Sequence, residues 1–190
     1  MSSNWVHLIR DIRDFPQPGV VFKDITPLLA SSSGFAAAVT DLVHAAPRDV
    51  DVVVGMEARG FIFAAPVALA LGVGFVPIRK PGKLPGAVLT ESYQLEYGTA
   101  ELAVHADAIG AGSKVLIVDD VLATGGTVAA AAELITKLGA DLVAAEVLIE
   151  LEFLGGRTYL AEQGIEEVIS RVVMRGTTPV PPTAPGSAGS

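Results

Sequence analysis

The amino-acid sequence predicts an α/β fold with a mostly parallel, twisted sheet flanked by helices. Three observations support this. Short apolar, β-branched runs alternate with helical segments of roughly ten to fifteen residues. The chain is 51% hydrophobic but only 6% aromatic, which is typical of buried parallel strands rich in Ala, Val, Leu and Ile. Its 190 residues suffice for one well-packed domain, which we expect to span residues 1–176.

The N-terminal part of the chain predicts alternating helices and strands. Asn4–Asp14 carries apolar residues at helical spacing and predicts a short amphipathic helix, ended by the prolines and glycine that follow. A loop then leads into the apolar residues Val20–Phe22. The next expected elements are a helix over 35–46, a strand over 51–55, a helix over 58–71 and a strand over 75–78.

A lid loop is expected at about residues 81–98. Pro81–Leu89 contains two prolines and two glycines, a composition typical of a flexible loop. Two runs with β character, 91–97 and 99–105, are separated by Gly98 and predict a hairpin or an extended excursion.

The C-terminal part predicts the rest of the sheet and a tail. The expected elements are a strand over 115–118, a helix over 128–138 capped by Gly139, and strands over 142–150 and 168–173. Residues 177–190 contain only Pro, Gly, Ser, Thr, Ala and one Val, without charges, so we expect a disordered tail.

Composition disfavours several classes of protein. The net charge of −8 argues against a nucleic-acid partner, which requires a basic surface. The absence of cysteine excludes disulfides and thiolate catalysis. The N-terminus shows no signal peptide, and the apolar stretches are too short to cross a bilayer. We therefore expect a cytoplasmic protein without membrane or nucleic-acid partners.

The most informative segment is Val115–Thr127, VLIVDDVLATGGT. An apolar strand reaches the carboxylates Asp119 and Asp120, and a small Thr/Gly loop then opens an Ala-rich helix. Free N–H groups at a helix N-terminus attract phosphate, and carboxylates accept hydrogen bonds from sugar hydroxyls. The alternative is a buried strand that ends in two solvated acids and a flexible turn. The loop sequence at this spacing favours a ribose 5-phosphate site.

Other charged residues are candidates for the same site. Arg59 follows a predicted strand, and Arg79, Lys80 and Lys83 gather three cations in an acidic chain, so we interpret them as a pyrophosphate site rather than a solvated surface. In the lid, Glu91 and Glu96 are candidates for stabilising positive charge or moving a proton, or are simply solvated. Tyr93 and Tyr97 fit packing roles. The scattered histidines show no metal-ligand spacing.

Five segments together resemble the adenine phosphoribosyltransferase family, within the type I phosphoribosyltransferases. They are FPQPGVVFKDITPLL (15–29), GMEARGF (55–61), RKPGKLPG (79–86), ESYQLEYG (91–98) and the 115–127 motif. The resemblance covers residues 9–152 and fades beyond Glu152. It implies the type I fold with a small hood, a homodimer, and Mg²⁺-dependent conversion of adenine and phosphoribosyl pyrophosphate to AMP and pyrophosphate.

The resemblance also implies roles for individual residues. The ribose hydroxyls would be held by the two aspartates, and catalysis would involve Arg59, Glu96 and Tyr97. The 5-phosphate would be held by Ala123, Thr124, Gly125, Gly126 and Thr127. The pyrophosphate would be bound by Arg59, Arg79, Lys80 and Lys83, and adenine by Val21, Phe22 and Lys23. No direct metal ligand is expected, because the pyrophosphate would carry the Mg²⁺.

Two alternatives remain at the level of sequence. A phosphoribosyltransferase for another base would keep the 115–127 motif and differ around Val21–Asp24. A regulator that senses phosphoribosyl pyrophosphate and binds nucleic acid would need a basic surface or an added domain, neither of which the sequence contains.

Overall fold

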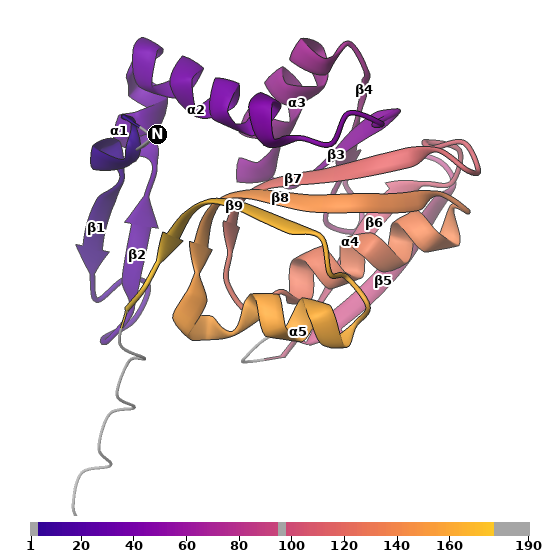
Figure 1. Cartoon of the computed structure of the whole chain (residues 1–190). Helices are drawn as coiled ribbons and strands as arrows, with labels where there is room; N and C mark the ends of the chain where they lie inside the picture. Colours follow the sequence, from indigo (N-terminus) through magenta and orange to yellow (C-terminus); the bar gives the residue numbers. More distant parts are fainter. Residues whose placement is uncertain (1–3, 95–97, 177–190) are drawn as a thin grey trace, which may run out of the picture.

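A five-stranded parallel sheet with helices on both faces forms the centre of the molecule (Figure 1). The computed structural model describes residues 4–94 and 98–176. The strand order is β4-β3-β7-β8-β9, and every neighbouring pair is parallel. The strands are β3 (Val52–Met56), β4 (Gly74–Ile78), β7 (Lys114–Leu122), β8 (Asp141–Leu151) and β9 (Val168–Met174). The predicted parallel sheet is confirmed.

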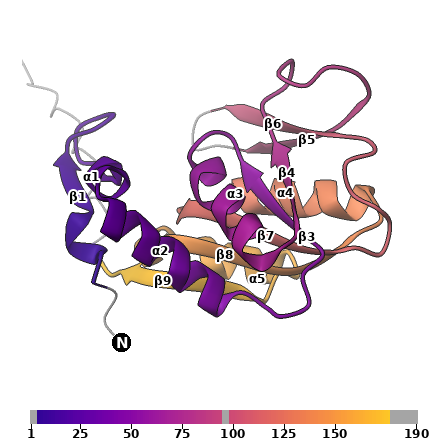
Figure 2. The ribbon, with the colours of Figure 1, turned by 90° about the horizontal axis from the view of Figure 1, so that it is seen from above.

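Helices cover both faces of this sheet, two on each face. Helices α2 (Ser32–Ala45) and α3 (Arg59–Leu71) cover one face, and α4 (Gly126–Lys137) and α5 (Gly156–Glu162) cover the other (Figures 1 and 2). All five residues of β3 are buried because alternate side chains enter the two hydrophobic cores. No helix within the described ranges is long and apolar enough to cross a membrane.

A small hood lies beside the carboxyl ends of the strands (Figure 1). It consists of a 3₁₀ turn, η1 (Val6–Leu8), an antiparallel pair, β1 (Arg10–Arg13) and β2 (Val21–Asp24), and the short helix α1 (Thr26–Ala30). The predicted helix over Asn4–Asp14 is therefore wrong. Trp5 is 1% exposed and its indole Nε1 donates to Asp41 Oδ2 at 2.7 Å, so the apolar residues enter the core from a single turn before the chain pairs with β2.

The predicted hairpin forms between β5 (Val88–Gln94) and β6 (Thr99–His105), which pair in antiparallel register. Of the expected lid, residues 81–87 are irregular and Val88–Gln94 form strand β5. A backbone bridge between Arg79 and Ala103 joins the hairpin to the end of β4. The hairpin also packs against α4, so its base is fixed beside the loop that opens that helix.

The strand that carries the two aspartates is longer than predicted. Asp119 and Asp120 were expected where the strand ends, but β7 continues to Leu122. The cause is its partner β8, which extends the ladder through the pair Leu122↔Glu150. The short segments α1, α5 and η2 (Glu152–Leu154) carried no clear periodic signal in the sequence and were not predicted.

One carboxylate inside the sheet layer lacks hydrogen-bond partners. Glu146 of β8 is fully buried, and among the described residues neither of its oxygens finds a partner. Burial raises the pKa of Glu146 to about 8, and the positive charge of Arg171 on β9 only partly opposes this rise. The folded protein therefore favours the protonated acid over a pH range in which the unfolded chain ionises.

We predict that Glu146→Gln stabilises the protein at alkaline pH. An acid whose pKa is raised on folding binds more protons in the folded state, so the wild type loses stability as pH rises from about 4.5 to about 8. The neutral glutamine avoids this loss, and we expect a gain of roughly 3 kcal/mol at pH 9 and little change at pH 5. Thermal or urea unfolding at both pH values measures it. The exposed Glu133→Gln serves as the control, and an equal effect of Glu146→Gln at both pH values would contradict the prediction.

Candidate active site

A cleft of about 460 Å³ opens at the carboxyl end of the sheet, where ligands bind in parallel α/β folds. It lies between the end of β3, the segment after β4, the hairpin and β7. Its lining residues are Met56, Glu57, Ala58, Arg59, Lys80, Pro81, Tyr93, Ala100, Glu101, Leu102, Asp119, Asp120, Val121 and Thr127. Four segments that are distant in the sequence thus meet at one site.

The floor of this cleft carries the two aspartates. The Asp120 side chain is 6% exposed, and its Oδ2 lies 2.9 Å from Nε of Arg59. The Asp120 backbone N–H donates to Oδ1 of Asp119 at 2.9 Å. Burial raises the pKa of both carboxyls, and the neighbouring charge of Asp120 raises that of Asp119 further, whereas Arg59 opposes the rise. Hydroxyl donors from a ligand would reduce this cost of ionisation.

The first turn of α3 touches the same aspartates. A Cβ added to Gly60 would lie 2.6 Å from Oδ1 of Asp119, closer than a side chain tolerates. Glycine therefore lets the helix approach the carboxylate directly. The preceding residue, Arg59, can then reach across the cleft to Asp120.

The loop after β7 has the geometry of an anion site. Gly125 adopts φ +88° at the N-cap of α4, a conformation that favours glycine, and the helix begins at Gly126. The N–H groups of a helix's first turn lack intrahelical partners, and the helix dipole favours negative charge there. Thr127 Oγ1 donates to the Tyr93 hydroxyl at 3.4 Å, so β5 also contacts this loop. The predicted phosphate loop thus borders the two acids.

The predicted cation cluster forms around Glu57. Nε and Nη2 of Arg79 lie 3.1 and 3.3 Å from its two carboxyl oxygens, and the Lys80 backbone N–H donates to Oε2 at 3.2 Å. Arg79 Nη1 donates to the carbonyl of Lys83 at 3.0 Å. These contacts lower the pKa of Glu57, and the hydrogen bonds from Arg79 have the largest effect. Glu57 therefore orders the segment that carries the cations.

No described residue of the hood lines the cleft, but the ring of Phe22 lies beside Arg59, which does. Phe22 stacks edge-on against Phe15 with centroids 5.2 Å apart, and the guanidinium of Arg59 lies 5.2 Å from the Phe22 centroid. Val21 is 40% exposed beside it, and the Lys23 side chain donates to Asp11 at 2.6 Å. Arg59 thus links the aromatic ring of the hood to Asp120 of the sheet.

Not every predicted residue enters the cleft. Glu91 does not line it, because its carboxylate pairs with Lys137 of α4 at 2.5 Å. Glu96 and Tyr97 lie outside the described residues. Two residues were missed as functional: Glu57 and Tyr93. The carboxylate that directly follows a buried strand was the available signal for Glu57, whereas the contact of Tyr93 with Thr127 depends on the hairpin's placement.

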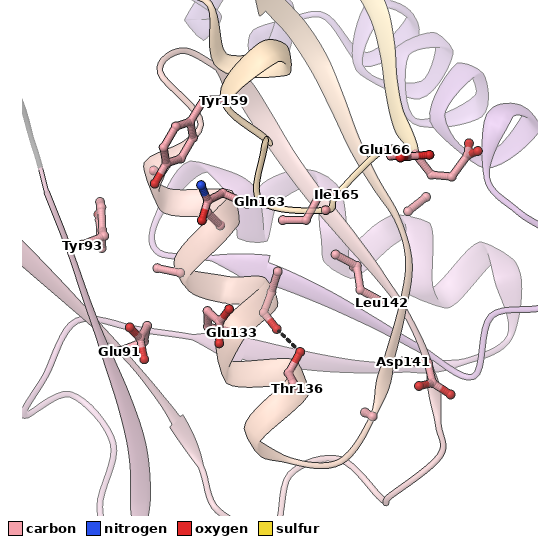
Figure 3. Close-up of a pocket in the computed structure, with 18 of the residues that line it drawn as sticks. Glu91, Tyr93, Glu133, Thr136, Asp141, Leu142, Tyr159, Gln163, Ile165 and Glu166 are labelled. Atoms are coloured by element: carbon pink, nitrogen blue, oxygen red, sulfur yellow. Dashed lines mark hydrogen bonds between the residues drawn. The ribbon is translucent and has the colours of Figure 1, made fainter. Parts of the chain in front are cut away.

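A larger hollow, of about 720 Å³, is lined in part by Tyr93 and Gly126 but not by Arg59 or the two aspartates (Figure 3). It is bounded by β5, α4, α5 and the start of β8. Figure 3 shows that Glu133 and Thr136 come from α4, and Tyr159 from α5. Carboxyl groups with shifted pKa values are typical of functional sites. Asp119 and Asp120 have raised pKa values and line the smaller cleft. We therefore assign the chemistry to the smaller cleft.

Comparisons with known proteins agree with this geometry. Residues 23–163 match the model of a family described as phosphoribosyl transferase domain. Adenine phosphoribosyltransferase of Cutibacterium acnes is 67% identical over 161 residues, 85% of this chain and 91% of that protein.

Two solved structures are also similar. Adenine phosphoribosyltransferase from Thermoanaerobacter pseudethanolicus has a TM-score of 0.87 and 46% identity, and the match covers 92% of this chain and 100% of that one. The Saccharomyces cerevisiae enzyme, complexed with an imino-altritol bisphosphate and adenine, has a TM-score of 0.82 and 37% identity over 90% of this chain and 97% of that one.

Proposed function

The chain belongs to the phosphoribosyl transferase domain family, and on this premise we propose that it transfers the 5-phosphoribosyl group from phosphoribosyl pyrophosphate to adenine, giving AMP and pyrophosphate. The observation that carries the proposal is Arg59, which contacts Asp120 at 2.9 Å and lies 5.2 Å from the Phe22 ring. An aromatic surface for a base therefore adjoins a pair of acids for a ribose. The reaction is one of purine salvage.

The sugar phosphate binds at the end of β7. Ribose hydroxyls donate to the carboxylates of Asp119 and Asp120, which favours their ionised forms. The 5-phosphate accepts N–H bonds from the loop Ala123–Thr127 at the start of α4. The loop separates the carboxylates of Asp119 and Asp120 from the 5-phosphate, so these negative charges are not in contact.

The pyrophosphate leaves toward the cations. The segment that Glu57 orders carries Arg79, Lys80 and Lys83. Lys80 and Pro81 of this segment line the cleft. Two of the carboxylates that line the cleft, Asp119 and Asp120, are adjacent and lie beside Arg59. This set suits Mg²⁺ because that ion keeps waters and takes few protein ligands. Mg²⁺, carried mainly by the pyrophosphate, would neutralise charge on the leaving group.

Adenine binds against the hood. Phe22 supplies the ring surface, and the backbone groups of Val21 and Lys23 lie on the strand beside it. Adenine presents an amino donor next to a ring acceptor, so a C=O and an N–H complement it. An oxo purine reverses the pattern and would leave buried groups unpaired, which supports strong discrimination.

The transfer itself requires charge stabilisation and loss of a proton. N9 of adenine bonds to C1′ of the ribose as the bond from C1′ to the pyrophosphate oxygen breaks, and the N9 proton leaves. We assign proton transfer to Glu96, with Tyr97 in support of the closed lid. A closed lid would exclude water from the cationic sugar.

The enzyme acts as a homodimer in the cytoplasm under this proposal. Helix α3 is apolar throughout its length after Arg59, and Ala65 and Pro66 remain half-exposed one turn before Leu69. Leu69 is 83% exposed. A continuous apolar stripe at the surface is typical of a protein interface, and a second copy of the chain is the occupant that we propose.

The first experiment measures AMP formation from adenine, phosphoribosyl pyrophosphate and Mg²⁺, with guanine, hypoxanthine and orotate in parallel. We expect turnover with adenine alone. Turnover with another base would keep the phosphate site and contradict the assigned base pocket. Binding of the sugar phosphate without turnover of any base would instead favour a regulator that senses phosphoribosyl pyrophosphate.

Replacing both acids with amides should weaken sugar binding selectively. We expect Asp119→Asn combined with Asp120→Asn to weaken ribose 5-phosphate binding on the order of 10²-fold, because two charge-assisted hydrogen-bond acceptors are lost. Isothermal titration with ribose 5-phosphate gives the affinity. The exposed Asp107→Asn is the control, and an affinity equal to that of the wild type would refute the assignment.

A charge in the apolar stripe of α3 should break the dimer. We expect the wild type to sediment as a dimer and Leu69→Glu as a monomer, because a carboxylate cannot be buried unpaired at an interface. Sedimentation velocity measures this. Val173→Glu, which changes an exposed apolar residue on the opposite edge strand, should stay dimeric. A monomeric wild type would disprove the proposed assembly.

A further inference from the structure

The phosphate loop rests directly on α5. A Cβ added to Gly156 would collide with the carbonyl oxygen of Ala123 and lie 3.0 Å from Cδ1 of Leu122. A Cβ added to Gly125 would in turn lie 2.9 Å from the carbonyl oxygen of Gly156 and 3.0 Å from Cδ1 of Tyr159. Two glycines therefore bring the loop and the helix into backbone contact. A side chain at either position would have to displace backbone.

Helix α5 is held in place by a network of hydrogen bonds around Arg157. Its Nε and Nη2 bind the two carboxyl oxygens of Glu150 at 3.0 and 2.6 Å. Its Nη1 donates to the carbonyl of Val168 at 2.7 Å, and Nη2 also reaches Ser170 Oγ at 2.9 Å. The hydroxyl of Ser170 donates to Glu150 as well. One arginine thus ties α5 to both β8 and β9.

The two charged members of this network, Glu150 and Arg157, form an ion pair. The Glu150 side chain is nearly buried, and its bond with Arg157 is the main cause of its lowered pKa. A planar guanidinium that binds a carboxylate through two N–H groups fixes orientation as well as distance. The network lies behind the loop, and neither Glu150 nor Arg157 lines the active-site cleft.

The loop needs such support because it has little of its own. Its residues Ala123, Thr124 and Gly125 are small, and within the described chain no side chain caps the N-terminus of α4. Backbone N–H groups stabilise an anion well only where their positions are fixed before it binds. The contact with Gly156 is the nearest fixed surface behind them.

We propose that Gly156 and Arg157 are positioning residues for the sugar 5-phosphate: Arg157, through Glu150 and Ser170, fixes α5, and Gly156 fixes the carbonyl of Ala123 and hence the phosphate-binding amides. We call these four residues the α5 brace. The inference rests on the proposed function, because it concerns the same phosphate site. Figure 3 shows Tyr159 of α5 beside α4.

The test compares two ligands on the same variants. Ribose 5-phosphate needs the loop, whereas inorganic pyrophosphate binds at the cation cluster. We expect Gly156→Ala to weaken ribose 5-phosphate binding about tenfold or more, since displaced binding groups lose affinity steeply, and to leave pyrophosphate binding within about twofold. The KM of this variant for phosphoribosyl pyrophosphate should rise in parallel with the loss of ribose 5-phosphate affinity. Gly110→Ala, at an exposed glycine where a Cβ makes ordinary contact, is the control.

A second variant separates positioning from folding. Arg157→Lys keeps the charge but cannot bind Glu150 through two parallel N–H groups. We expect it to show the same ligand-selective loss in smaller degree, and Arg157→Met to show a larger one. If these variants lose thermal stability but bind ribose 5-phosphate as the wild type does, the brace is only structural and the inference is wrong.

Measurements on the wild-type protein separate a failure of this inference from a failure of the proposed function. Wild-type protein that binds neither ribose 5-phosphate nor adenine overturns the proposed function, and the inference with it. Wild-type protein that forms AMP, together with a Gly156→Ala variant of unchanged ribose 5-phosphate affinity, overturns the inference alone.

Discussion

The pairing of β7 between β3 and β8 is the constraint on which the site depends. This strand is buried on both faces, and its ladder with β8 continues past the aspartates to Leu122. The ladder with β3 ends at Val118, so Asp119 and Asp120 are held by the ladder with β8, which continues along β7 before and after them. The turn that follows starts from a fixed point, so the phosphate loop begins at a defined distance from the acids.

Arg59 connects the parts that this strand does not reach. It follows the end of β3, and Gly60 lets the first turn of α3 approach Asp119 closely. From there the guanidinium contacts Asp120 and lies over Phe22 of the hood. A cation that is both paired with a carboxylate and near an aromatic face links two sub-structures through one side chain. Under the proposed function, this contact would place the base and the ribose relative to each other.

Sequence predicted best what is encoded locally. The 115–127 motif places acids, loop and helix start within thirteen consecutive residues, and the structure brings them together as predicted. The helical spacing in Asn4–Asp14 misled, because Trp5 reaches the core from a single turn and β1 then needs β2, which lies farther along the chain. The position of Glu57 directly after a buried strand was a local signal, but its pairing with Arg79, 22 residues away, was not. The role of Arg157 likewise depends on Glu150, 7 residues away on another element.

The same geometry explains how an acidic chain can receive a highly anionic substrate. Arg59 is paired with Asp120 and Arg79 with Glu57, so two cations of the site are already balanced by carboxylates before the substrate arrives. Buried charge without a partner would be costly, and these pairs keep the arginines oriented. Burial raises the pKa of Asp119 and Asp120, so holding these two carboxyls ionised is costly. Under the proposed function, ribose hydroxyls would compensate those acids, which would leave the guanidinium of Arg59 more available to the phosphates.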